Sequence, residues 1–169
     1  MAQTTFSGPV RSLAGFITAG VNSTISLAAD TTLTVAAHAG KIIFLDDADG
    51  KFTLPSINVN TPTDPTAPSQ ENNTGASFYF YVVTAATDLD ILTDGTDKFV
   101  GAVMVAVDDG AKKAFVPAAS NDVITLNGST KGGIVGSVVR ITAIDDATYL
   151  VHDSLLIGSG TIVTPFADA

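Results

Sequence analysis

The sequence predicts an all-β domain, a compact antiparallel β-sandwich or β-barrel, and three observations lead to this prediction. Short runs rich in β-branched and aromatic residues recur along the chain, with glycine-containing turns between them. Sixteen of the seventeen acidic residues are aspartate, which favours turns, and only Glu71 is glutamate, which favours helices. In the alanine-containing run at 100–107, Val103, Val105 and Val107 recur at every second position, which suits a strand rather than a helix.

The strand-like runs supply the core of the predicted domain. Ten of them are expected to form strands: residues 24–27, 32–35, 41–45, 52–54, 78–83, 100–107, 123–126, 138–144, 149–151 and 155–157. The sequences IIFL at 42–45 and FYFYVV at 78–83 are apolar on both faces. These two strands are therefore expected either to be central and covered on both sides, or to lie against another chain.

Hairpin turns are expected between several of these runs, because Asp-Gly and Asn-Gly dipeptides tolerate the positive φ of primed turns. The dipeptides are Asp49-Gly50, Asp94-Gly95, Asp109-Gly110 and Asn127-Gly128. The first lies in LDDADGKFTL, which also has features of a calcium loop. With Gly50 at the sixth loop position, only Asp47 and Asp49 fall on ligand positions, since Leu45 and Ser56 occupy the first and twelfth. The stretch is interpreted as a turn, with metal binding as the alternative.

The chain is expected to form one domain with two irregular segments. Residues 1–23 contain Gly8-Pro9 and no strand alternation, and are expected to form an extended N-terminal arm. Residues 24–169 are expected to form the single β domain. Within it, residues 58–75 are rich in proline and polar side chains and are expected to be a long surface loop.

The charge of the chain bears on its partners. Seventeen acidic against eight basic residues give a net charge of −9, which argues against binding to a phosphate backbone, so no nucleic-acid partner is expected. No apolar stretch approaches the roughly eighteen residues of a membrane span, and the first twenty residues lack the pattern of a secretory signal. No membrane partner is expected. The absence of cysteine fits synthesis in a cytoplasm.

A search for catalytic and metal-binding patterns finds no recognisable motif. The two histidines, His38 and His152, could form a metal site with a carboxylate, but no spacing motif supports one. Gly158-Ser159-Gly160 lacks the flanks of a nucleophile elbow, and the paired aspartates lie at predicted turns, where solvated aspartate is expected. The sequence therefore predicts a protein that is not an enzyme, with no catalytic residue, metal or cofactor.

Several stretches resemble a virion-protein module of tailed bacteriophages. TLTVAAHAGKIIFLDDADGKFTLP at 32–55 resembles the opening of that module, SFYFYVV at 77–83 resembles its aromatic strand, and residues 97–166 resemble its second half. The leader FSGPVRSLAGFI at 6–17 resembles the N-termini of phage structural proteins. The resemblance covers nearly the whole chain, and it rests on turn glycines and β-branched runs rather than on chemical motifs.

The resemblance implies a particle component, and a capsid decoration (cement) protein best fits a small, acidic, cysteine-free, all-β chain with an arm. It implies a jelly-roll-like or β-tulip-like fold, a homotrimer, the major capsid protein as partner, and a place on the capsid surface of the virion after synthesis in the host cytoplasm. Unless the arm folds back on its own core, capsid or inter-subunit contacts are expected at Phe6, Pro9, Val10, Arg11, Leu13, Phe16 and Ile17.

The alternative function is a tail-fibre or receptor-binding module that recognises host-surface carbohydrate. Its twelve aromatic residues include no tryptophan, which weakens the expectation of a sugar-stacking platform.

Overall fold

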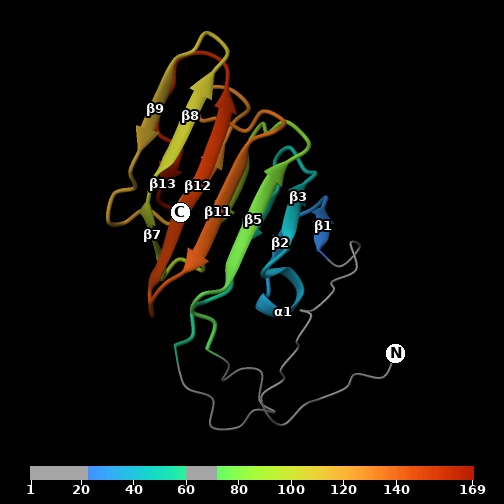
Figure 1. Ribbon diagram of the computed structural model, residues 1–169, viewed down its shortest axis with the longest axis vertical. Helices are drawn as coiled ribbons and strands as arrows, with labels where there is room; N and C mark the ends of the chain where they lie inside the picture. The colour runs from blue at the N-terminus through green and yellow to red at the C-terminus, as the bar shows by residue number, and fades with distance from the viewer. Residues whose placement is uncertain (1–22, 60–71) are drawn as a thin grey trace, which may run out of the picture.

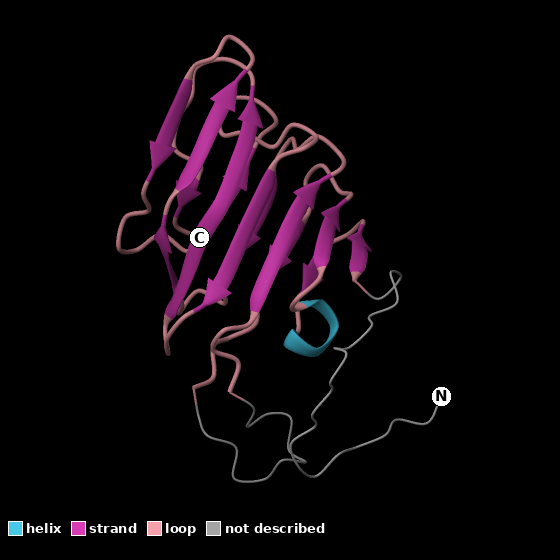
Figure 2. Ribbon diagram, viewed as in Figure 1, coloured by secondary structure: helices cyan, strands magenta, loops and turns pink. Residues whose placement is uncertain are grey.

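The computed structural model describes residues 23–59 and 72–169, and this part of the chain is nearly all-β (Figure 1 and Figure 2). An eight-stranded sheet contains β1 (Thr24–Leu27), β3 (Ile42–Leu45), β5 (Ser77–Val82), β7 (Lys98–Gly101), β8 (Val103–Val107), β9 (Lys112–Phe115), β11 (Val138–Ala143) and β12 (Thr148–Gly158). A five-stranded sheet contains β2 (Thr31–Thr32), β4 (Lys51–Thr53), β6 (Leu89–Leu92), β10 (Val123–Leu126) and β13 (Phe166–Ala167). The described helix α1 (Val35–His38) has one turn.

The two sheets form two layers with the core between them. The larger sheet has the order β1-β3-β5-β11-β12-β8-β9, with β7 also paired to β12, and it faces the viewer in Figure 1. The smaller sheet has the order β13-β10-β6-β4-β2 and lies behind it. Ile43 and Phe80 from one sheet and Ile91 and Ile124 from the other are almost completely buried. Each such side chain contributes about 1.5–3 kcal/mol to the free energy of folding.

The prediction of antiparallel sheets is wrong for the first half of the molecule, where both sheets are parallel. From β1 to β6 consecutive strands alternate between the sheets, so that β1, β3 and β5 pair in parallel and β2, β4 and β6 do the same. A chain that crosses to the opposite sheet after every strand returns in the same direction, which makes neighbours parallel. The second half has antiparallel pairs, such as β5 with β11 and β11 with β12, but β7 and β8 both pair in parallel with β12. Both sheets therefore contain parallel and antiparallel pairs of strands.

Most of the predicted hairpin turns are instead crossings between the two sheets. Asp109-Gly110 does join two antiparallel strands, β8 and β9. Asp49-Gly50 connects β3 of the larger sheet to β4 of the smaller one, and the other two dipeptides also connect strands of different sheets. Gly50 does not have a positive φ. It is required by space, because a Cβ there would lie 2.8 Å from the ring of Phe52.

Strand boundaries differ from the predicted ones where side chains cap or interrupt the backbone. Residues 32–35 do not form a strand as a unit, because Thr34 is the N-cap of α1 and its hydroxyl accepts a hydrogen bond from the amide of Ala37. The predicted strand at 100–107 is divided at Gly101, which has a φ of 97° and whose added Cβ would lie 2.1 Å from the carbonyl oxygen of Val151. The predicted strands at 149–151 and 155–157 are one strand, β12, and three short strands, β6, β9 and β13, were not predicted.

The predicted arm and most of the predicted loop lie outside the described residues, which begin at Ser23 and omit 60–71. The two ends of the loop at 58–75 are held together. The amide of Asn58 donates to Oδ1 of Asn73 at 2.7 Å, and the amide of Asn73 donates to the carbonyl of Asn58 at 2.8 Å. Among the described residues, no helix has the length and apolar character needed to cross a membrane.

Candidate functional site

The outer face of the eight-stranded sheet, the face turned away from the core, carries a series of apolar side chains among the described residues. Side chains alternate along each strand, so Ile43, Leu45, Phe78 and Phe80 point inward and are buried. The residues between them, on β3 and β5, point outward, yet they are also apolar or aromatic (Ile42, Phe44, Tyr79 and Tyr81). Ile42 is 38% exposed, and the other three are partly exposed. Within the described residues these two strands are covered on one side only.

The register of the sheet aligns these side chains with others into an apolar row, which we define as Phe44, Tyr81, Val138, Leu155 and Met104. Each residue of the row is directly opposite the next on the neighbouring strand, across β3, β5, β11, β12 and β8. The rings of Phe44 and Tyr81 meet edge to face, with centroids 5.9 Å apart. Leu155 is 42% and Met104 43% exposed. The row therefore presents a continuous apolar line across five strands.

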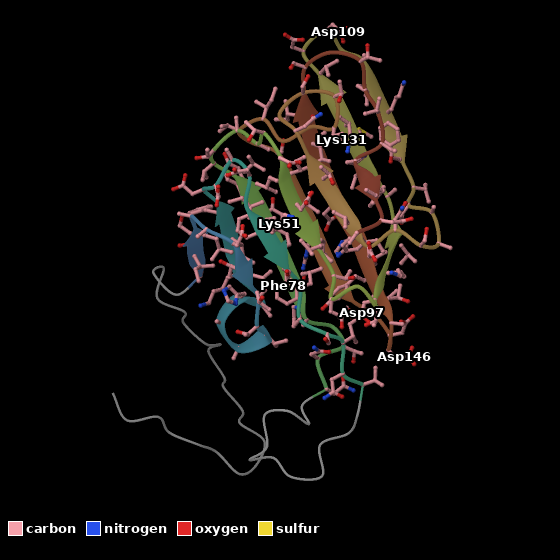
Figure 3. The ribbon with its side chains drawn as sticks, turned by 180° about the vertical axis from the view of Figure 1, so that it is seen from behind. Lys51, Phe78, Asp97, Asp109, Lys131 and Asp146 are labelled. Atoms are coloured by element: carbon pink, nitrogen blue, oxygen red, sulfur yellow. The ribbon has the colours of Figure 1, made fainter. Side chains whose placement is uncertain are left out.

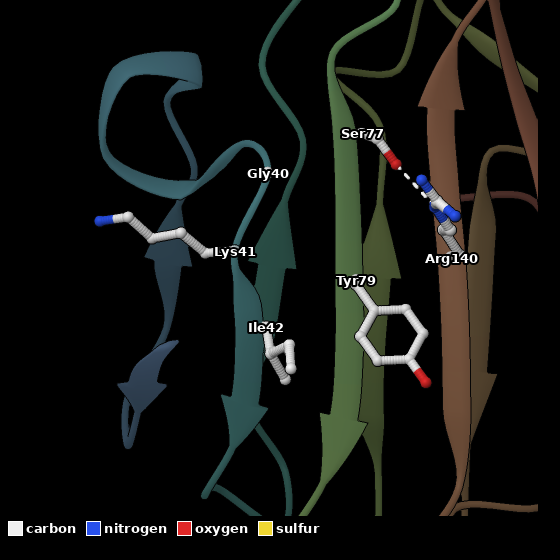
Figure 4. A pocket seen from close by; sticks show the side chains of 6 residues that line it. All are labelled: Gly40, Lys41, Ile42, Ser77, Tyr79 and Arg140. Carbon is white, nitrogen blue, oxygen red and sulfur yellow. Dashed lines mark hydrogen bonds between the residues drawn. The ribbon is translucent and has the colours of Figure 1, made fainter. Parts of the chain in front are cut away.

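A second row, parallel to the first, is more polar and consists of Ile42, Tyr79, Arg140 and His152. Ile42, Tyr79 and Arg140 come from adjacent strands, and with Gly40, Lys41 and Ser77 they line a shallow hollow at one end of the sheet (Figure 4). Arg140 Nε donates to Ser77 Oγ at 3.0 Å. The hollow thus combines an aromatic ring with two cationic side chains.

Asp153 joins Arg140 and His152 into one hydrogen-bonded group. Its Oδ2 lies 3.4 Å from a terminal nitrogen of Arg140 and 3.1 Å from Nδ1 of His152. Nε2 of His152 is 2.9 Å from the hydroxyl of Thr142. Arg140 and His152 of the second row therefore already have hydrogen-bond partners within this chain.

A β-bulge at Asp153 keeps both rows on the same face. Between Val138 and Arg140 on β11 there is one residue, whereas between their partners on β12, Leu155 and His152, there are two. The extra residue, Asp153, has a φ of 46°, which is uncommon for a residue other than glycine. In a regular strand, His152 and Leu155 would point to opposite faces because they are three positions apart, so the bulge is what keeps both side chains on the outer face.

The outer face differs in charge from the rest of the chain. Asp153 is the single acidic residue in the strands of the eight-stranded sheet, which also contain Arg140 and the lysines of β7 and β9. The remaining described acids lie mostly in turns at the ends of strands. Figure 3 shows two of these, Asp109 and Asp146, at opposite ends of the molecule. The negative charge is thus concentrated away from the apolar row.

A group of acids at one end of the sheets has altered pKa values, and its contacts are structural. Burial raises the pKa of Asp97, and the nearby charges of Asp94, Asp145 and Asp146 add to this, although its Oδ2 accepts a hydrogen bond from the amide of Ile57. Burial opposes ionisation of Asp94 as well, but hydrogen bonds from Ser56, Thr96 and the amide of Asp97 prevail and lower its pKa to about 2. These carboxylates hold the strand end before the loop at 58–75 against the turn at 94–97.

Burial also raises the pKa of Tyr149, together with the charges of Asp97 and Asp94. Its hydroxyl donates to the carbonyl of Pro55, so it belongs to the same structural group. Among the described residues, no cluster of three or more histidine, cysteine, aspartate or glutamate side chains is arranged to hold a metal ion.

The residues named from the sequence are placed as follows. The predicted contact residues Phe6, Pro9, Val10, Arg11, Leu13, Phe16 and Ile17 all lie outside the described residues. His38 is part of α1, where its Nδ1 accepts a hydrogen bond from the amide of Thr34 at 3.0 Å, and His152 lies on the outer face. The two histidines thus have separate local partners. The two-sided apolar character of 42–45 and 78–83 is the sequence signal for the outer face, but Val138, Leu155 and Met104 join it only through register.

Comparison with protein-family models gave no match, and neither the curated proteins nor the solved structures contain a significant match to this chain. The function is therefore argued from the outer face and its surroundings.

Proposed function

We propose that this chain is a non-enzymatic structural protein of a tailed-bacteriophage virion that binds and stabilises the capsid shell as a decoration protein. The observation that supports a role in assembly is the outer face, where an apolar row crosses five strands in register, while the assignment to a capsid rests on the resemblance of the sequence to phage structural proteins. Extended exposed apolar surfaces on folded domains mark contacts with other macromolecules. The proposal therefore describes a protein whose work is assembly.

The shape of the outer face favours a protein partner over a small molecule. Small-molecule sites are concave and enclose most of the ligand, whereas this face is a sheet surface with a shallow hollow at one end. Stacking of the two layers in the manner of a β-sandwich would make the domain a stiff slab, which suits a protein that reinforces a shell. The acids at the strand ends keep such a slab soluble.

In this proposal the partner is the major capsid protein and the location is the capsid surface. The shell contact is assigned to the N-terminal segment, in which Phe6, Val10, Leu13, Phe16 and Ile17 supply apolar area. Each would contribute about 1.5–3 kcal/mol if fully buried on the shell. The resemblance of the leader and the two halves of the chain to phage structural proteins supports the same assignment.

The proposal is tested by mixing the purified chain with expanded capsids that lack it. We expect saturable binding at micromolar concentration and a higher temperature of capsid disruption, measured by co-sedimentation and by release of packaged DNA. A chain lacking residues 1–20 should keep the far-ultraviolet circular dichroism of a β protein but not bind. Capsids that take up none of the full chain would overturn the proposal, and equal uptake of the shortened chain would overturn the assignment of the contact.

The hollow supports the second candidate, a receptor-binding module for carbohydrate. Tyr79 offers a ring face and Arg140 offers hydrogen-bond donors on the neighbouring strand, whereas the Lys41 side chain points away from the ring (Figure 4). A glycan array probed with the full chain and with Tyr79→Ala separates the two functions. Glycan binding that depends on Tyr79, without capsid binding, would favour the second candidate.

A further inference from the structure

We infer that the outer face is a self-association surface, on which a second copy of this chain packs face to face about a two-fold axis. The inference goes beyond the proposed function, because it names the occupant of the apolar row and leaves the shell contact to other parts of the chain. Four features of the outer face support it: size, charge, shape and satisfied polar groups.

The size of the face matches what a stable dimer needs. Seven strands in hydrogen-bonded order lie about 4.8 Å apart and average about six residues, or roughly 20 Å, in length, so the face projects roughly 600 Å². The accessible area of a surface covered with side chains exceeds its projection. A typical specific interface buries about 800 Å² on each partner.

The charge of the face permits two copies of an acidic chain to meet. The chain carries a net charge of −9, and two such chains repel one another wherever their acids approach. On the outer face Asp153 is matched by Arg140 at 3.4 Å, while Asp109 and Asp146 lie at the two ends of the molecule. Packing face to face therefore brings together the region of each copy with the fewest unpaired acids.

The shape of the face favours a two-fold arrangement over the three-fold one implied by the resemblance. Two twisted sheets can pack face to face at about 10 Å separation with their strands about 30° apart, so that the two apolar rows cross. Such a contact is isologous, since the same patch serves on both copies. Three copies of a face about 29 Å wide would meet around a three-fold axis mainly along their margins. Only the two-fold arrangement buries the centre of the row, Val138 and Leu155.

Burial of the second row leaves few polar groups without partners. Arg140 is bonded to Ser77 and Asp153, and His152 to Asp153 and Thr142, all within one chain. A buried charge is costly chiefly when it is unpaired. This group therefore enters an interface with its partners already in place.

The test is the mass of the purified full chain in solution, measured without capsids by sedimentation velocity and light scattering from about 0.1 to 100 µM, the range of ordinary specific dimers. We expect a monomer–dimer equilibrium. Leu155→Asp, at the centre of the row, should raise the dissociation constant at least a hundredfold. Val163→Asp is the matched control, because Val163 is 42% exposed, like Leu155, and lies on the connection to β13 of the five-stranded sheet, away from the outer face. It should leave the dissociation constant within threefold of the original.

Met104→Lys provides a second disrupting variant near the edge of the row, in case Leu155→Asp does not fold, and circular dichroism reports folding for each. A full chain that is monomeric at 100 µM, or trimeric, would overturn the inference. So would dimers that both variants leave intact. If the full chain is monomeric but a chain lacking residues 1–20 dimerises, the occupant is the chain's own N-terminal segment, and the inference is wrong. Since no capsid is present, these results are independent of the proposed function.

Discussion

The two faces of the eight-stranded sheet are built from the same strands and differ in what covers them. On β5, Phe78, Phe80 and Val82 point inward and are buried, while Tyr79 and Tyr81 between them point outward and are partly exposed. Both sets are large and apolar or aromatic. The difference teaches that a strand with two apolar faces need not be a central strand of a three-layer core. It can be the outer layer of a domain that presents its second face to another chain.

The largest expected effect comes from mutating two neighbouring residues of β5 that lie on opposite faces of the sheet. Phe80→Ala should lower the free energy of unfolding by about 3–5 kcal/mol, because it opens a cavity in the core. Tyr81→Ala, one residue away on the outer face, should lower the monomer's free energy of unfolding by about 1 kcal/mol or less and weaken self-association. Urea unfolding at submicromolar concentration measures the first quantity, and sedimentation measures the second. Equal losses of stability would show that the outer face is covered within the monomer.

The next effect concerns the division between β7 and β8, which lets both strands pair with β12 and places Met104 in the apolar row. Gly101→Ala should lower the free energy of unfolding by about 3 kcal/mol, since its Cβ would lie 2.1 Å from the carbonyl oxygen of Val151 at a φ of 97°. Gly110→Ala is the control. Gly110 has a φ of 86° with nothing within 4 Å of an added Cβ, so about 1 kcal/mol is expected. Thermal unfolding of both variants isolates the steric contact, and equal losses would contradict this account.

The smallest expected change in stability comes from mutating an acid that lies away from the outer face. Because the pKa of Asp94 is lowered to about 2, its hydrogen bonds stabilise the fold at pH above the unfolded value near 3.9, and this contribution is lost as pH falls toward 2. Asp94→Asn should cost about 1 kcal/mol at pH 7, a figure reduced for the exposure of the carboxylate. The loss should shrink below pH 4 and disappear near pH 2. Urea unfolding across this range measures it, and a loss independent of pH would contradict the assignment.

Asp97→Asn tests a carboxyl group at the same site whose pKa is shifted in the opposite direction from that of Asp94. Burial raises the pKa of Asp97, so its charged form destabilises the fold at neutral pH, and stability is gained as pH falls through the raised value. The substitution should therefore be neutral or stabilising at pH 7, in contrast to Asp94→Asn. A loss at pH 7 equal to that of Asp94→Asn would show that its hydrogen bond to Ile57 outweighs its burial.

Local sequence patterns predicted the all-β class and the position of several strands, but not how those strands pair. The run at 24–27 and the run at 123–126 became strands with the same limits. Composition does not show whether the chain turns back after a strand or crosses to the other sheet. Asp49-Gly50 was therefore interpreted as a hairpin turn, although it joins strands of two different sheets. Short strands such as β6 were missed because Leu89 and Ile91 alone show alternation.

The candidate site was less accessible to prediction, because register creates it. Tyr81 and Leu155 are far apart in sequence and become members of one row only through β11. Which face each β12 side chain lies on depends on the bulge at Asp153, and no sequence pattern predicted the positive φ of this residue. The sequence did show that 42–45 and 78–83 are apolar on both faces. Of the two expectations drawn from this, contact with another chain is the one on which the proposed self-association rests.

The alternation of strands between the sheets from β1 to β6 has a consequence for how fast the chain folds. No two consecutive strands in this half are neighbours, so each pair joins strands that are separated in sequence by a strand of the other sheet. Folds dominated by such non-local pairs reach the native state in roughly milliseconds to seconds. The bonds between Asn58 and Asn73 close the longest connection near its base. Its length adds little to the entropic cost of closing it, because that cost grows only with the logarithm of loop length.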